Sequence, residues 1–292
     1  MNWLMYAILG AVLAGASPVL AKSGMRKADS HLAAALRGTF LFLGAWFMVN
    51  QTGVKMQLAG IGQTTFVYLI FSGIATGIVW ICFVRALQLG EVIKAVPIVE
   101  GSVILNRLAG IFLLKDELTW NIIAILIILI VGTLMMGLKG SGKGGKRGKW
   151  IWYALGAMVF TTATVILDRV GITGVNDTFE RMLRYGIALL TVWLVVFATK
   201  GHKALRSISF LDGMNMCLSG VAMGAAWFCF HKAYVLGTNS VVEIIEQFDL
   251  VAAVFLGCVF MRERLSVRAI FGMILMMLGF WLLLADFPII PL

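Results

Sequence analysis

The chain has 292 residues, of which 61% are hydrophobic and 13% are charged, and its mean hydropathy is +0.96. A soluble domain is about half apolar and a quarter charged, so this composition excludes an ordinary water-soluble fold. The net charge of +10 is spread over short loops between apolar segments, which is a membrane pattern, so we expect no nucleic-acid partner.

Ten apolar segments are long enough to cross a bilayer, which takes about 20 helical residues. In chain order they are residues 3–21, 32–50, 65–88, 93–113, 118–138, 150–170, 179–198, 212–236, 241–261 and 266–286. The first resembles a secretory signal peptide, but Asn2 and Trp3 supply no positive charge before it, so we expect a retained helix. The sequence therefore predicts an all-α integral membrane protein with ten transmembrane helices.

The two halves of the chain align without a gap at a shift of 147 residues. Rare residue types recur at this shift, in the pairs Trp3 and Trp150, Trp46 and Trp193, Trp80 and Trp227, Cys82 and Cys229, and Arg37 and Arg184. Three tryptophan pairs at one shift are not expected by chance, so we predict an internal duplication. We expect one five-helix repeat in residues 1–140, a Gly/Lys linker in 141–148, and a second five-helix repeat in 149–292.

An odd number of helices in each repeat makes the second repeat enter the membrane in the opposite sense. Inverted repeats are typical of alternating-access transporters, which bind their substrate near the midplane between the repeats. Lys and Arg gather in the loops after the first, fifth, seventh and ninth segments, around Lys22, Lys143, Lys203 and Arg264. Short basic loops stay in the cytoplasm, so we expect the linker inside, both termini outside, and a multi-pass protein of the plasma or inner membrane.

Two pairs of segments recur in the repeats, namely residues 83–90 (FVRALQLG) before 113–119 (LLKDELT) and residues 230–237 (FHKAYVLG) before 260–266 (FMRERLS). They resemble the EamA type of the drug/metabolite transporter superfamily, whose acidic position before Leu-Thr/Ser is held here by Asp116 and Glu263. The resemblance covers nearly the whole chain and implies a ten-helix transporter. Of the prolines that the family often has in spans four and nine, only Pro97 is a near counterpart, and Glu246 stands in the ninth span. The resemblance to several ten-helix members implies cytoplasmic termini, whereas the loop charges of this chain favour termini outside.

Ionisable side chains inside the apolar segments are candidates for function, because a charge inside a membrane is costly. Glu243, Glu246 and Asp249 are spaced by three residues along the ninth segment, and Glu100 and Arg107 are spaced by seven along the fourth. Carboxylates at this depth can exchange protons or bind a cationic group. The alternative for Glu243 is a place near the membrane surface, and for Glu100 and Arg107 it is a structural ion pair.

Further candidates lie near the end of the eighth segment, where His231 and Lys232 are placed to contact a substrate. A cation at a helix end also interacts favourably with the helix dipole, which is the structural alternative. Trp80 and Trp227 occupy equivalent places in the third and eighth segments and offer aromatic faces to a cationic ligand. Packing against neighbouring helices is the alternative for both tryptophans.

Gly73 and Gly77 have the small-residue spacing that lets membrane helices approach closely, and Gly220 and Gly224 repeat it. This repetition predicts a packing seam, either within the fold or between the two protomers of a homodimer. Residues 137–143 match the start of a phosphate-binding loop, but a glycine follows where a Ser or Thr is required, so we interpret them as a charged linker.

The four cysteines lie in apolar segments, and the sequence holds neither a Cys/His spacing pattern nor a set of nucleophile and base. We therefore expect no disulfide, no metal, no cofactor and no enzyme activity. The leading hypothesis is a proton-coupled or exchanging secondary transporter that exports a polar, amino-acid-like or cationic compound, because carboxylates outnumber cations near the midplane.

Two other functions are compatible with the pattern. One is a nucleotide-sugar or sugar-phosphate antiporter, which would need several midplane cations. The candidates for that role are Arg37, Arg107, Arg184, Lys94 and Lys232. The other is a non-transporting membrane subunit that supports lipid-linked sugar flipping.

Overall fold

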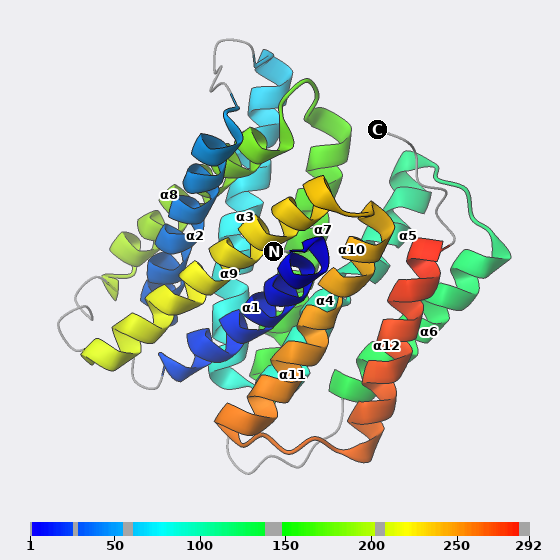
Figure 1. The fold of residues 1–292 in the computed structure, drawn as a ribbon. Coiled ribbons are helices and arrows are strands. Elements are labelled where there is room, and N and C mark those ends of the chain that lie inside the picture. Colours follow the sequence, from blue (N-terminus) through cyan, green and yellow to red (C-terminus); the bar gives the residue numbers. More distant parts are fainter. Residues whose placement is uncertain (1, 26–28, 55–60, 138–147, 202–207, 286–292) are drawn as a thin grey trace.

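A computed structural model describes residues 2–25, 29–54, 61–137, 148–201 and 208–285, and all regular elements in these ranges are α-helices (Figure 1). The helices are α1 (Trp3–Ser23), α2 (Ser30–Thr52), α3 (Gln63–Leu89), α4 (Val92–Glu100), α5 (Ser102–Leu114), α6 (Trp120–Gly137), α7 (Lys149–Gly171), α8 (Asp177–Ala198), α9 (Phe210–Leu236), α10 (Asn239–Glu246), α11 (Phe248–Met261) and α12 (Val267–Ala285). They form ten candidate membrane spans whose ends lie within two residues of the predicted ones. The linker predicted at residues 141–148 falls almost wholly outside the described ranges.

The fourth and ninth spans, predicted at 93–113 and 241–261, are confirmed as spans, and each consists of two helices with a break between them. The first break is at Gly101, between α4 and α5, and the second is at Gln247, between α10 and α11. At the shift of 147 residues the two breaks differ by one position. Pro97 has no N–H to donate within α4, which weakens the helix just before its break. In the ninth span neither α10 nor α11 contains a proline, so its break follows Glu246 without that cause.

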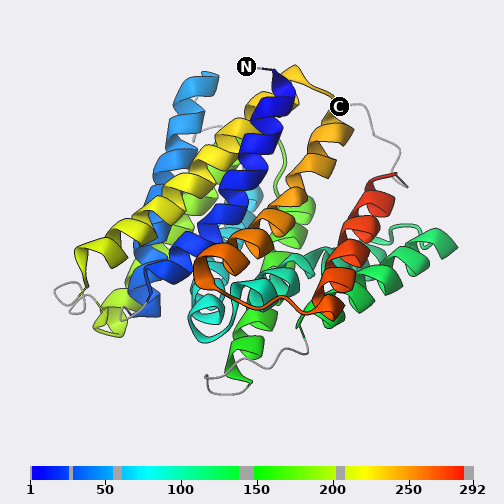
Figure 2. The ribbon, with the colours of Figure 1, turned by 60° about the horizontal axis from the view of Figure 1, so that its bottom comes forward.

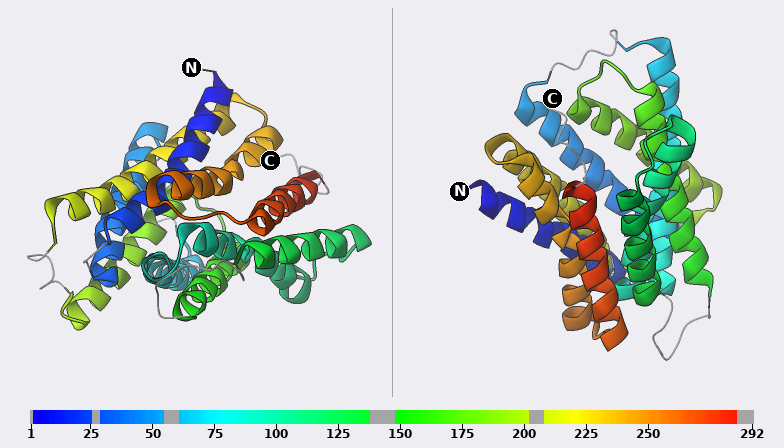
Figure 3. Two further views of the ribbon diagram at one scale, coloured as in Figure 1. Left: turned by 90° about the horizontal axis from the view of Figure 1, so that it is seen from below. Right: turned by 90° about the vertical axis from the view of Figure 1, so that its right-hand side faces the viewer.

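Helices of one repeat pack mainly against helices of the other. α1 packs against α9 and α11, and α7 packs against α3 and α5. In the same way α2 packs against α9 and α8 packs against α3, and α2 and α8 also pack against each other. These pairs exchange places when the chain is shifted by 147 residues. α6 and α12 pack together at one edge of the bundle (Figures 1 and 3), and the beginning of α1 and the end of α12 lie toward the same end of it (Figure 2).

Glycine seams hold the interleaved helices at short distances. A Cβ on Gly73 of α3 would lie 2.6 Å from the Ile187 side chain of α8, and one on Gly224 of α9 would lie 3.3 Å from Cα of Gly44 in α2. The repeated small-residue motif therefore forms a seam within the fold, as one of the two predicted alternatives states. Because each position is filled by the partner helix, a larger residue would push the two helices apart.

Large apolar side chains cover the outside of the bundle, as expected for a surface that faces lipid rather than water. The most exposed aromatic residues lie at the ends of spans, with Phe112, Trp120, Trp152 and Phe210 between 76% and 85% exposed. Aromatic rings concentrate where the hydrocarbon meets the headgroups. Their positions fit a ten-span bundle that crosses a bilayer.

Candidate functional site

The two helix breaks bring three acidic side chains together, and we call Glu100, Glu246 and Asp249 the carboxylate cluster. Glu100 is the last residue of α4, Glu246 is the last residue of α10, and Asp249 lies in the first turn of α11. The charge of Glu100 acts on those of Glu246 and Asp249, and Asp249 also interacts with Glu246. All three side chains are half-buried. The sequence predicted these residues as candidates, and the fold places them within electrostatic range of one another at the two helix breaks.

Glu246 is the member of the cluster with the most complete set of neighbours. The Tyr234 hydroxyl of α9 donates a hydrogen bond of 2.7 Å to its Oε2 atom. The charges of Arg181 in α8 and of Glu243, one turn earlier in α10, also act on it. Glu243 is half-buried and interacts electrostatically with Tyr234 as well. Glu246 therefore has one neutral donor and one nearby cation, together with a second carboxylate on its own helix.

An aromatic stack adjoins this cluster. Tyr185 of α8 lies between the two repeat-related tryptophans, with ring centroids 5.4 Å from Trp80 and 4.9 Å from Trp227, the latter nearly parallel. The Arg181 guanidinium, one turn earlier on α8, lies 5.7 Å from the Trp227 centroid. Trp80 is buried and packs on Gly38, whereas Trp227 is half-buried, so Trp227 is the better placed of the two to meet a ligand.

The remaining predicted residues lie in other surroundings. Arg107 is in the middle of α5, where its guanidinium is 3.8 Å from the Asp116 carboxylate in the loop that follows. His231 interacts electrostatically with Arg181, which links it to the site. Lys232 lies over the Phe228 ring of its own helix, with Nζ 5.6 Å from the centroid.

Sequence reasoning missed three residues of the site, namely Tyr185, Tyr234 and Arg181. One signal was available for Tyr185, because the repeat alignment places it opposite Gly38. The first repeat thus has a glycine against Trp80 where the second has an aromatic ring. Arg181 lies within the first two turns of α8.

The arrangement suits the binding of a proton or a cationic group. Neighbouring carboxylates in a low-dielectric interior repel one another, and each is costly to keep charged unless a proton, a cation or hydrogen-bond donors neutralise it. Discontinuous helices at the middle of a span are also where transporters of several folds bind their substrates and coupling ions. An aromatic face beside the carboxylates adds a surface that attracts cations.

Comparisons with known proteins agree with this interpretation of the fold. The sequence model of the EamA-like transporter family matches residues 1–138 and again residues 148–285. A curated relative from Sinorhizobium sp., named "Uncharacterized transporter in cobO 3'region", is 29% identical over 117 residues, which are 40% of this chain and 83% of the relative. A solved structure described as "Crystal structure of protein" is 16% identical over 97% of each chain with a TM-score of 0.59, which shows a shared fold. The chain is therefore a membrane transporter that belongs to the EamA-like transporter family.

Proposed function

We propose that the protein is a secondary active transporter that works by alternating access on a small polar, amino-acid-like or cationic compound. Transport is coupled to protons or proceeds by exchange, and its direction is export across the plasma or inner membrane. The observation that carries the proposal is the meeting of Glu100, Glu246 and Asp249 at the breaks of two helices. With the basic linker inside, both termini lie outside the cell.

The charge balance of the site favours a cation or a zwitterion as the substrate. The site holds four carboxylates, those of the cluster and Glu243, whereas Arg181 is the one arginine whose charge acts on Glu246 among the described residues. A substrate ammonium group can bind the carboxylates and lie on the face of Trp227. For a zwitterion, Arg181 supplies the partner for the substrate carboxylate.

The charges also weigh against a nucleotide-sugar or sugar-phosphate antiporter. Arg184 contacts Asp168 and Glu180, Arg107 lies near Asp116, and Lys94 forms a 2.6 Å ion pair with Glu91. These cations are already engaged with carboxylates, so a phosphate would have to compete for them. No observation on the described residues specifically favours the third alternative, a non-transporting subunit in lipid-linked sugar flipping.

The test is uptake of a radiolabelled panel into proteoliposomes, with amines, amino acids and nucleotide sugars as separate arms and with an imposed pH gradient. Glu246→Gln is expected to give a folded, monodisperse protein that loses pH-driven uptake. Exchange between loaded pools survives if only the proton step is lost, whereas loss of exchange as well means that Glu246 binds the substrate. The matched control is Asp177→Asn, at an exposed acid at the start of α8.

Three outcomes would contradict parts of the proposal. Wild-type uptake by Glu246→Gln, with the same pH profile, would remove Glu246 from the site. Uptake of nucleotide sugars alone would replace the substrate class with that of the antiporter. A panel that gives no uptake in either direction, from protein shown to be folded, would favour the non-transporting alternative.

A further inference from the structure

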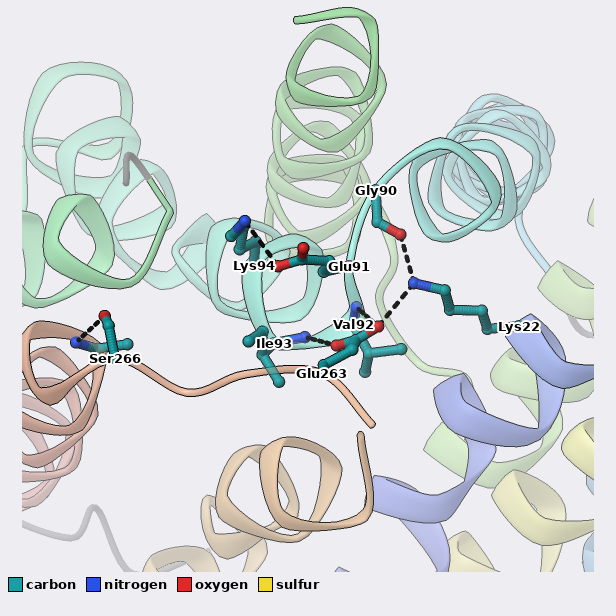
Figure 4. Close-up of polar contacts among 9 residues, drawn as sticks. Lys22, Gly90, Glu91, Val92, Ile93, Lys94, Glu263 and Ser266 are labelled. Carbon is teal, nitrogen blue, oxygen red and sulfur yellow. Dashed lines mark hydrogen bonds and ion pairs between the residues drawn. The ribbon is translucent and has the colours of Figure 1, made fainter. Parts of the chain in front are cut away.

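Two charged pairs at opposite ends of the bundle are related by the shift of 147 residues. The first pair is Lys22 with Glu263, and the second is their exact repeat counterpart, Arg169 with Asp116. Lys22 Nζ lies 2.7 Å from the Glu263 carboxylate and 2.5 Å from the Gly90 carbonyl (Figure 4). In the second pair the nearest nitrogen and oxygen are 3.7 Å apart. One pair is thus closed and the other is loose.

The closed pair also joins the two repeats at a helix end. Glu263, in the loop before α12, accepts hydrogen bonds from the backbone N–H groups of Val92, at 2.9 Å, and Ile93, at 3.0 Å (Figure 4). These are the free amides of the first turn of α4, where the helix dipole favours a negative charge. Lys22 of α1 then neutralises the same carboxylate. Three segments, from α1, α4 and the loop before α12, are therefore held together by one side chain.

The corresponding helix end in the second repeat lacks this cover. α10 begins at Asn239, the counterpart of Val92, and Asn239 is exposed whereas Val92 is fully buried. The side chains of the loose pair are 51% and 31% exposed for Arg169 and Asp116, against 21% and 6% for the closed pair. The structure is therefore closed at the end that holds Lys22 and open at the end that holds Arg169.

The loops that carry the two acids have the same local conformation. Lys115 and Arg262, which precede the acids, both adopt the left-handed region, with φ of 61° and 55°. Three residues after each acid, the Thr119 and Ser266 hydroxyls accept bonds from the first turns of α6 and α12. Because the loops match, Asp116 is already shaped to do at α10 what Glu263 does at α4.

We propose that these pairs are two alternating locks, so that Lys22, Glu263, Arg169 and Asp116 are positioning residues of the transport cycle. In the opposite state, Asp116 accepts the amides of the first turn of α10 and Arg169 donates to the Gly237 carbonyl, while Glu263 leaves α4. This inference rests on the proposed alternating access and adds the contacts that hold each end shut. Each lock stabilises one state only, so removing it shifts the population toward the other.

Spin-label distances across each end test the locks directly. In a background without the four native cysteines, labels at Leu89 and Arg264 span the closed end, and labels at the repeat-related Leu236 and Glu117 span the open end. Double electron–electron resonance in nanodiscs then gives the populations of the two states without any substrate. Wild type is expected to show mainly the short distance at the first pair and mainly the long distance at the second.

Glu263→Ala is expected to change the population ratio by about tenfold or more toward the opposite state, because bonds to a charged group are lost. The 89–264 distance lengthens and the 117–236 distance shortens. Adding Asp116→Ala, which removes the opposite lock, returns the populations toward wild type. If Glu263→Ala is not recovered as a monodisperse protein, Lys22→Met is used in its place with the same expected direction.

Charge exchange separates a lock from a plain ion pair. Lys22→Glu with Glu263→Lys restores the pair but leaves the α4 amides without an acceptor, so it is expected to behave like Glu263→Ala. Wild-type distances in the exchanged protein, unchanged distances in Glu263→Ala, or a further shift on adding Asp116→Ala would each overturn the proposal. If the spin-label distances change with the substitutions as expected, but the protein transports no compound of the radiolabelled panel, only the substrate assignment is refuted. Transport with unresponsive distances would refute only the locks.

Discussion

Arg37 in α2 and Arg184 in α8 occupy equivalent positions of the repeats, yet they should respond very differently to replacement by methionine. Arg37 is only 5% exposed, and its guanidinium donates to the Ser219 hydroxyl at 3.1 Å and to the Ser17 hydroxyl at 3.3 Å. Each hydroxyl donates in turn to the backbone carbonyl of the other serine, at 2.7 and 2.9 Å. Removing the guanidinium therefore leaves both hydroxyls with their own acceptors.

Arg184 has acidic partners instead. It forms ion pairs with Asp168 of α7 and, at 3.3 Å, with Glu180 of its own helix. Asp168 also accepts a 2.7 Å bond from the Ser72 hydroxyl of α3. Alanines stand at the positions of both acids in the first repeat. Methionine at position 184 would thus leave two carboxylates without their cation.

These surroundings set the expected magnitudes. Breaking a buried ion pair by removing one partner costs about 3–5 kcal/mol, because the other charge stays buried. Arg37→Met removes two hydrogen bonds to a charged group, worth about 1.5–3 kcal/mol each. It also removes the cost of burying the Arg37 cation without an acidic partner, which is several kcal/mol in the wild type, so the two effects largely offset each other. We expect Arg184→Met to lower the free energy of unfolding by about 3–5 kcal/mol and Arg37→Met to change it by less than about 2 kcal/mol.

Denaturant titration in detergent, followed by tryptophan fluorescence, measures both variants against wild type. The control is Asp168→Asn in the Arg184→Met background, which should recover part of the loss because it removes one stranded carboxylate. Equal destabilisation by Arg37→Met and Arg184→Met would refute the reasoning, as would a double variant that is less stable than Arg184→Met alone.

Three further predictions concern packing, the site and topology. Gly73→Val should destabilise the protein by about 1–3 kcal/mol in the same titration, since it forces α3 from α8, while Gly62→Ala, which meets no atom within 4 Å, should be neutral. Tyr234→Phe keeps the ring but removes the donor to the carboxylate cluster, so the uptake rate should fall by about tenfold, and an unchanged rate would contradict this. An engineered cysteine after Pro291 should react with an impermeant reagent from outside and one in 141–148 should not, and the reverse pattern would invert the proposed orientation.

The spans could be predicted from the sequence because membrane crossing depends on length and apolarity alone. The breaks could not, since the two spans differ in the feature that weakens the helix. Pro97 precedes the first break, whereas no proline is present in α10 or α11 and the second break follows Glu246. Only the repeat relation connects the two breaks. A break in the fourth span, once recognised, would therefore have predicted one at nearly the equivalent position of the ninth span.

The candidate site was predicted in part for the same reason. Ionisable residues in apolar spans stand out by composition, so Glu100, Glu246 and Asp249 could be selected before any contact was known. The apolar pattern of α8 does not select Tyr185, because it does not say which face of the helix meets the other repeat, and only the repeat alignment with Gly38 pointed to it. The contact of Glu263 with the start of α4 joins residues about 170 positions apart, and local spacing carries no information about it.

The interleaving of the repeats has a consequence for how the protein is made. When the ribosome has completed α6, the first five spans are in the membrane, but α1 and α3 lack their principal partners, α9 and α7. Ala7, Ala11 and Ala14, which are buried in the finished bundle, then face lipid or the insertion machinery. α3 gains its partner when α7 is synthesised, but α1 must wait for α9, so the first half cannot complete its packing before α9 is made, and its buried faces are accessible to a chaperone or a quality-control protease until then.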